Sequence, residues 1–307
     1  MKRAHSSPQT RSLAVAATVV FALHAVGCTD NEPSIAPDPP AAASDHQLDA
    51  SPMDVRKPGQ GCPEGLPGPV MAEVPAPDGT SYCIDTTEVT QGHYFAFIEA
   101  KGGDPAGKTL PDSSGQPPEC KDNVSFGPPP LAHYDDCSDW WPPAYDPTGE
   151  HPANPVGCVD WCDAVAYCTW AGKRLCGRIG GGASAPSELA NAQTSQWYNA
   201  CSQGGTTAYS FGNTFVEGVC PEGANPVTEA PCAPPDGPFS SIDRLSGGLG
   251  EWEDACEERD SGIKFCRIRG GCYIGDLSKA ERTACDCEFL NGIRVRNPST
   301  GFRCCLD

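Results

Sequence analysis

The chain has 307 residues and a formal net charge of −19, because 40 aspartates and glutamates outweigh 21 lysines and arginines. Such an excess of negative charge repels phosphate backbones, so nucleic acid is excluded as a partner. The 34 glycines and 32 prolines predict a loop-rich body, and 19 cysteines indicate an exported protein with a disulfide framework rather than a cytosolic one.

Residues 1–27 resemble a bacterial lipoprotein signal peptide. Three basic residues precede the apolar core Leu13–Leu23, which is too short to span a bilayer comfortably, and small residues lead up to Cys28. Cleavage before Cys28 would leave that cysteine for lipidation and an even number of cysteines in the rest of the chain. An ordinary secretory signal is the alternative, because Ala25 is a weaker choice than leucine at its position.

Residues 28–60 are rich in proline, alanine and aspartate and have few large apolar side chains. A segment of this composition cannot bury enough surface to offset the entropy lost on ordering, so we predict a disordered tether. The folded domain is therefore expected over residues 61–307.

The first helix predicted in this domain follows a short strand that begins at Tyr82. Thr90 is a favourable N-cap for it, because a threonine hydroxyl can accept a hydrogen bond from the free N–H groups of the first turn. Tyr94, Phe97 and Ile98 recur at helical spacing, so we expect them to face the core.

A second helix is predicted within Val159–Cys176. Asp160 is a suitable N-cap, Asp163 adds an acid to the first turn, and Gly172 supplies a C-terminal stop. The residues that take the spacing of one buried helical face are Trp161, Ala164, Val165 and Cys168.

Several motifs of the domain resemble those of the formylglycine-generating enzymes, also called sulfatase-modifying factors. The Val159–Cys176 segment is similar to their central helix, and Asp85–Thr90 is similar to the Asp-x-x-Glu-Val-Thr opening of their catalytic domain. Further matching segments are Tyr209–Asn213, Gly247–Trp252, Arg267–Tyr273 and Gly301–Arg303. The resemblance implies an irregular, loop-rich α+β fold, related to C-type lectin folds and stabilised by disulfides.

The resemblance also implies an active site that this chain lacks. Formylglycine-generating enzymes oxidise a substrate cysteine with molecular oxygen on copper(I), which two cysteine thiolates hold. The corresponding positions here are Gly275 and Ala280, whose side chains cannot bind copper. A relocated thiolate pair, Cys272 with Cys285 or Cys287, is the alternative that would preserve an oxidase.

The family's structural cysteines are retained. The resemblance implies the disulfides Cys168–Cys304 and Cys201–Cys285. Proximity along the chain suggests further local pairs, although connectivity cannot be derived from sequence. These pairs are Cys120–Cys137, Cys220–Cys232, Cys256–Cys266 and Cys272–Cys287.

Calcium remains an open alternative at Glu251. In the family, an asparagine and a glutamate of the Gly-Asn-x-Trp-Glu-Trp motif help to bind a structural calcium. Gly248 replaces that asparagine here while Glu251 is kept, so one oxygen ligand is missing, and Glu251 capping a turn is an equal alternative.

Other metal sites are disfavoured. The cysteines considered as zinc ligands crowd one helix in an oxidising compartment, and the histidines lack the spacing of the family's iron-binding relatives. These residues are Cys158, Cys162, Cys168 and Cys176 for zinc, and His93, His133 and His151 for iron.

We therefore expect a binding module at the cell envelope, without formylglycine-generating activity and attached to the membrane only through a lipid. Its partner is an unidentified protein, peptide or glycan. Trp140, Trp141 and Trp252 are candidate contacts, and core packing is the stronger role for Trp252. The alternatives are an oxidoreductase with a relocated metal–thiolate site and a structural envelope lipoprotein.

Overall fold

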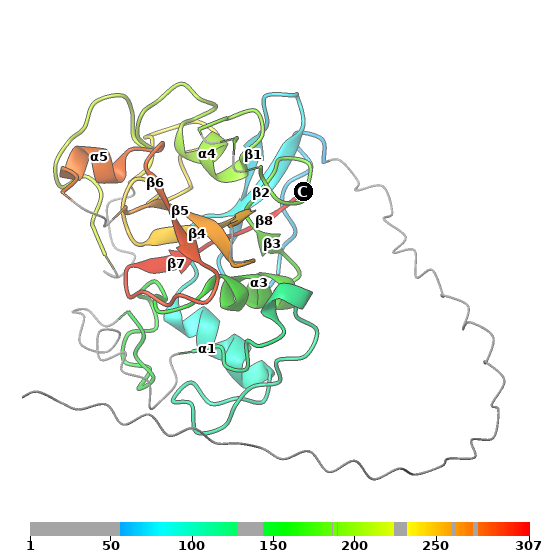
Figure 1. Ribbon diagram of the computed structural model, residues 1–307. Helices are drawn as coiled ribbons and strands as arrows, with labels where there is room; N and C mark the ends of the chain where they lie inside the picture. Colours follow the sequence, from blue (N-terminus) through cyan, green and yellow to red (C-terminus); the bar gives the residue numbers. More distant parts are fainter. Residues whose placement is uncertain are drawn as a thin grey trace, which may run out of the picture. The chain divides into compact units, whose positions relative to one another are not determined.

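We describe a computed structural model of the chain (Figure 1). The described residues are 56–127, 144–185, 187–188, 190–223, 232–259, 262–272 and 276–307. The predicted signal peptide with Cys28, most of the predicted tether, and the candidate contacts Trp140 and Trp141 lie outside these ranges. Within them, no helix is long and apolar enough to cross a bilayer.

The first of two four-stranded sheets is antiparallel throughout. Its strands lie in the order β1-β2-β8-β3. The C-terminal strand is therefore interior to the sheet, between two strands from early parts of the domain. The strands are β1 Met71–Pro75, β2 Ser81–Asp85, β3 Arg174–Leu175 and β8 Cys304–Leu306.

The second sheet is mixed and has the order β6-β5-β4-β7. Strands β4 and β7 run parallel, while the other pairs are antiparallel. The strands are β4 Gly250–Glu258, β5 Lys264–Gly270, β6 Glu288–Gly292 and β7 Thr300–Phe302. Because only Arg303 separates β7 from β8, the chain passes directly from this sheet to the first.

Short helices and many loops complete the domain. The helices are α1 Gln91–Ala100, the 3₁₀ turn η1 Pro118–Cys120, α3 Trp161–Trp170, α4 Gln196–Cys201 and α5 Lys279–Thr283. Helices α1 and α3 lie next to each other (Figure 1). Between them, the rings of Tyr94 and Tyr167 stack with centroids 5.8 Å apart. The predicted loop-rich α+β fold is confirmed.

Helix α3 begins where the sequence predicts. Asp160 and Asp163 form a capping box, in which each side chain accepts a hydrogen bond from the other residue's backbone N–H, and Gly172 has the left-handed φ of +71°. The buried face differs in one respect from the predicted one. Val165 is only half-buried, whereas Tyr167 is fully buried against α1.

Helix α1 is capped as predicted. The Thr90 side chain accepts a hydrogen bond from the His93 backbone N–H, and Tyr94, Phe97 and Ile98 are buried.

Disulfides connect segments that lie far apart in the sequence. Cys168 pairs with Cys304 and Cys201 with Cys285, the same pairs that the resemblance implies. The predicted pair Cys120–Cys137 is wrong, because η1 packs against the start of α3 and Cys120 is bonded to Cys162 there. Five more bridges join described residues to one another: Cys62–Cys83, Cys176–Cys305, Cys220–Cys232, Cys256–Cys266 and Cys272–Cys287.

The bridges to Cys304 and Cys305 restrict the same segment twice. When one of these bridges is in place, adding the other closes a ring of only about ten residues. When the other bridge is missing, the bridge that remains closes a very long loop. In the chain-entropy model, losing either bridge therefore costs about 3 kcal/mol. Replacing all four cysteines by alanine should cost about 1–2 kcal/mol more than the sum of the two single losses.

Guanidinium unfolding of the two single-bridge variants and the combined variant measures this difference. The variants Cys168→Ala with Cys304→Ala, and Cys176→Ala with Cys305→Ala, supply the single losses. Simple additivity would show that the two bonds do not share one constraint.

Candidate functional site

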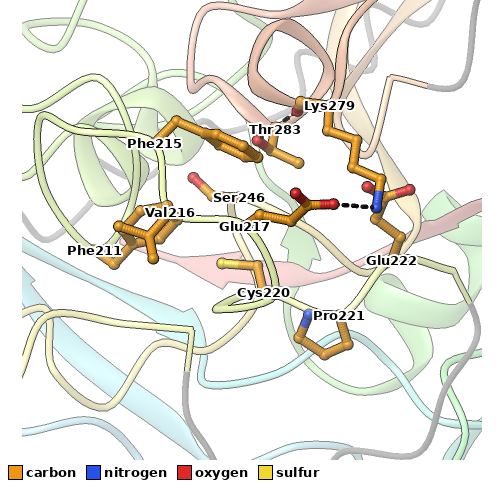
Figure 2. Close-up of a pocket in the computed structure, with 11 residues that line it drawn as sticks. Phe211, Phe215, Val216, Glu217, Cys220, Pro221, Glu222, Ser246, Lys279 and Thr283 are labelled. Atoms are coloured by element: carbon orange, nitrogen blue, oxygen red, sulfur yellow. Dashed lines mark hydrogen bonds and ion pairs between the residues drawn. The ribbon is translucent and has the colours of Figure 1, made fainter.

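A hollow of about 350 Å³ lies between the loop 211–222 and helix α5 (Figure 2). This volume is within the range of small-ligand pockets. Aromatic and aliphatic side chains form one end of the hollow, and charged side chains form the other (Figure 2). The lining residues are Phe211, Phe215, Val216, Glu217, Gly218, Cys220, Pro221, Glu222, Ser246, Lys279 and Thr283.

The apolar end is a small cluster of half-exposed aromatic rings. Tyr209 stacks on Phe211 with ring centroids 5.3 Å apart, and its centroid is 5.9 Å from that of Phe215. Val216 is 50% exposed beside them. Aromatic surface that is left in contact with water is available for a ligand.

Ion pairs join the two walls at the charged end. Lys279 Nζ lies 3.0 Å from Glu217 Oε1, and Arg282, also on α5, lies 3.6 Å from Glu222. The hydrogen bond from Lys279 to Glu217 raises the pKa of the lysine, so it stays charged. The Lys279 and Glu217 side chains are 52% and 71% exposed, so water screens their attraction and a ligand can compete for either group.

Ser246 forms the floor of the hollow. Its hydroxyl accepts a hydrogen bond of 2.8 Å from the Ser210 backbone N–H and lies 3.7 Å from the Cys201 sulfur. Because Cys201 is bonded to Cys285, the floor of the hollow lies against a disulfide.

A second hollow, of about 390 Å³, lies on the other side of α5. Among the described residues, its lining holds three carboxylates and no lysine, arginine or histidine. The lining residues are Tyr209, Leu277, Ala280, Glu281, Ala284, Asp286, Cys287 and Glu288. Since Tyr209 lines this hollow and stacks on Phe211 of the first, the two hollows are adjacent. We call both hollows together the α5 surface.

The position of the family's second copper ligand lies within the α5 surface. Ala280 offers only a methyl group there, and Gly275 lies outside the described residues. The alternative thiolate pair is not free to bind copper in this structure, since Cys272 is bonded to Cys287 and Cys285 to Cys201. Every cysteine among the described residues is disulfide-bonded, so none of them offers copper or zinc a thiolate.

Glu251 is placed among protein donors rather than in a metal site. The residue is 1% exposed, and its two oxygens accept hydrogen bonds of 2.7 Å each from Arg303. One of these oxygens also accepts a bond of 2.9 Å from the Trp197 indole. A carboxylate satisfied in this way is a poor calcium ligand, because its two oxygens already accept three hydrogen bonds, two of them from a guanidinium cation.

Glu88 is a second buried carboxylate, close enough to Glu251 to feel its charge. Its Oε1 accepts a hydrogen bond of 2.7 Å from the Leu249 backbone N–H, while its Oε2 has no hydrogen-bond partner among the described residues. Burial, followed by the Glu251 charge, raises the pKa of Glu88, so the side chain tends toward its neutral form.

The other predicted site residues have structural roles. Trp252 is 1% exposed and its indole donates to the Val159 carbonyl, so it belongs to the core and is not a contact for a partner. His93 lies against the Thr90 hydroxyl, and His151 is 2.7 Å from Asp146, while His133 lies outside the described residues.

Sequence reasoning missed the residues that line the first hollow. Phe211 and Phe215 lie about 60 residues from Lys279, and no local motif joins them. The signals that the sequence offers are the family-like segment Tyr209–Asn213 and the aromatic run that continues to Phe215, which Gly212 interrupts.

The model of the sulfatase-modifying factor enzyme 1-like domain matches residues 72–307. The formylglycine-generating enzyme of Mus musculus is 27% identical over 198 residues, and that of Bos taurus is 26% identical over 193 residues. Each alignment covers 55% of this chain and 51% of the relative, so the chain spans about half the length of these curated relatives.

Among solved structures, PvdO from Pseudomonas aeruginosa has a TM-score of 0.46 and 17% identity, covering 84% of this chain and 99% of that one.

The ion pairs of the domain differ in burial. The free energy of unfolding that is lost when a pair is broken should therefore differ as well. Glu253 is fully buried and 2.6 Å from the buried Arg269, so Glu253→Gln leaves a guanidinium without its counter-charge. We expect that variant to lose about 3–5 kcal/mol. Glu217→Gln breaks an exposed pair and should leave the midpoint of unfolding unchanged.

Denaturant unfolding of both variants beside the wild type gives the comparison. Equal losses would show that the Glu217–Lys279 pair holds α5 in place and is not free to exchange with a ligand.

Proposed function

Because the chain belongs to the sulfatase-modifying factor enzyme 1-like family, we propose that it is a member of that family that binds a partner without oxidising it. The observation that carries this proposal is the chemistry at Ala280. A methyl group replaces a copper ligand, and the cysteines nearby are in disulfides. The activity of the relatives concerns proteins about twice as long as the matched part of this chain.

The disulfide-rich domain indicates an oxidising compartment, since reducing conditions would open these bonds. We propose that the chain is exported by its N-terminal signal and held at the bacterial cell envelope by a lipid on Cys28. The acid-rich composition agrees with a partner that is neither nucleic acid nor an anionic membrane surface.

The α5 surface is the proposed binding site. Its first hollow offers aromatic rings beside exchangeable ion pairs, and its second offers carboxylates without a cation in the lining. Of the residues that the structure describes, five carboxylates line the two hollows, and Lys279 is the one cation that lines either. This composition favours a protein, peptide or glycan without negative charge, which would bring apolar groups to the rings and donors to the carboxylates.

An oxidoreductase with a relocated metal–thiolate site is not favoured. Its thiols would be Cys272 with Cys285 or Cys287, and each of these sulfurs is already bonded to another cysteine. Such an enzyme would first need a reductant to open a bridge.

Copper-dependent oxygen uptake tests the loss of oxidase chemistry. The full chain, given copper(I) and a cysteine-containing peptide, should consume oxygen no faster than copper and peptide alone, because the described cysteines offer no thiolate to hold the metal. Uptake above that background, if abolished by Cys272→Ser, would restore the oxidoreductase.

Binding to the α5 surface is tested with a matched pair of short peptides. Both contain phenylalanines, and they differ only in carrying lysines or glutamates. The lysine peptide should bind at least about tenfold more tightly. Phe215→Ser should weaken that binding by about tenfold, since it removes an aromatic contact.

Val295→Ser serves as the matched control, because Val295 is 40% exposed and lies outside the α5 surface. Equal binding of both peptides, or equal effects of the two substitutions, would contradict the assigned site.

A further inference from the structure

We infer that the guanidinium of Arg303, and not a calcium ion, is the cation that holds Glu251 in this chain. The resemblance to formylglycine-generating enzymes assigns a calcium ligand to the Glu251 position. This inference concerns the stability of the fold and is independent of the proposed binding function.

Both oxygens of Glu251 already accept hydrogen bonds from protein donors, one bond at Oε1 and two at Oε2. Arg303 Nε donates to Oε2 and Arg303 Nη2 donates to Oε1, both at 2.7 Å, which is the bidentate geometry of a strong arginine–carboxylate pair. The Trp197 indole donates to Oε2 at 2.9 Å. Calcium would have to displace these donors, and the guanidinium would then lose its counter-charge in the interior.

Arg303 cannot move aside without breaking other contacts. Its side chain is fully buried, and its remaining N–H groups donate to the carbonyls of Asp85 at 3.1 Å and Asp243 at 2.9 Å. Those carbonyls belong to separate parts of the domain. A permanent positive charge fixed in this position also repels a divalent cation beside Glu251.

The position of the family's asparagine is closed as well. Gly248 has the left-handed φ of +63°, and a Cβ added there would lie 2.7 Å from both carboxylate oxygens of Glu88. The Glu88 carboxylate is itself buried and bonded to the Leu249 backbone N–H at 2.7 Å. An asparagine side chain at this position would therefore collide with the carboxylate of Glu88.

The test is thermal unfolding of the full chain in 1 mM calcium chloride and in 1 mM EGTA. A site with a Kd of about 10 µM would raise the Tm by about 5–10 °C in calcium. We expect the two Tm values to agree. Arg303→Lys keeps the charge but loses the bidentate contact, so it should lower the Tm by the same amount in both conditions.

Glu251→Gln separates the outcomes if calcium does raise the Tm. A calcium shift that this variant abolishes makes Glu251 a ligand and overturns the inference. A shift that survives in the variant places the ion elsewhere and leaves Glu251 with Arg303.

The Trp197 indole N–H gives a measurement that needs no variant. Its proton resonance reports on the bond to Glu251 Oε2 and should not move when calcium is added to the wild type. A large shift of that resonance on calcium addition would overturn the inference even if Glu251→Gln failed to fold.

Discussion

The domain depends on one short segment near its C-terminus, which joins the two sheets. Strand β7 pairs with the second sheet and β8 with the first, and Arg303 between them forms the buried pair with Glu251. The adjacent Cys304 and Cys305 then bind this segment to α3 and to the residue after β3. A buried charge tolerates little displacement and a disulfide tolerates none beyond its geometry, so the two kinds of constraint fix the relative position of the sheets together.

The ion pairs of the core and the ion pair of the α5 surface differ in how much they contribute to the stability of the fold. Pairs in the interior, such as Lys173 with Asp85 at 2.6 Å, are fully buried and specify the fold. The pair between Lys279 and Glu217 is exposed and contributes little to it. A scaffold that is held from within in this manner tolerates substitutions at its surface without unfolding.

The sequence predicts what local chemistry decides. The cap at Asp160 and the buried face of α1 depend on residues a few positions apart, and both are found. Partners that lie far apart in the sequence are not predicted by such local patterns. Proximity in sequence predicts Cys137 as the partner of Cys120, whereas the partner in the structure, Cys162, lies 42 residues away on α3. Glu251 pairs with Arg303, which is 52 residues away in the sequence. The first hollow likewise needs tertiary contact between a loop and α5, which no local pattern encodes.

The bridge between Cys272 and Cys287 encloses α5 within a closed ring whose ends lie 15 residues apart in sequence. The covalent closure holds the two ends of the ring together next to β5 and β6, which flank it. The enclosed stretch can therefore vary in sequence much as an antibody loop varies on its framework. The domain is thus a natural starting point for libraries of engineered recognition proteins, with diversity confined to α5 and its flanking turns.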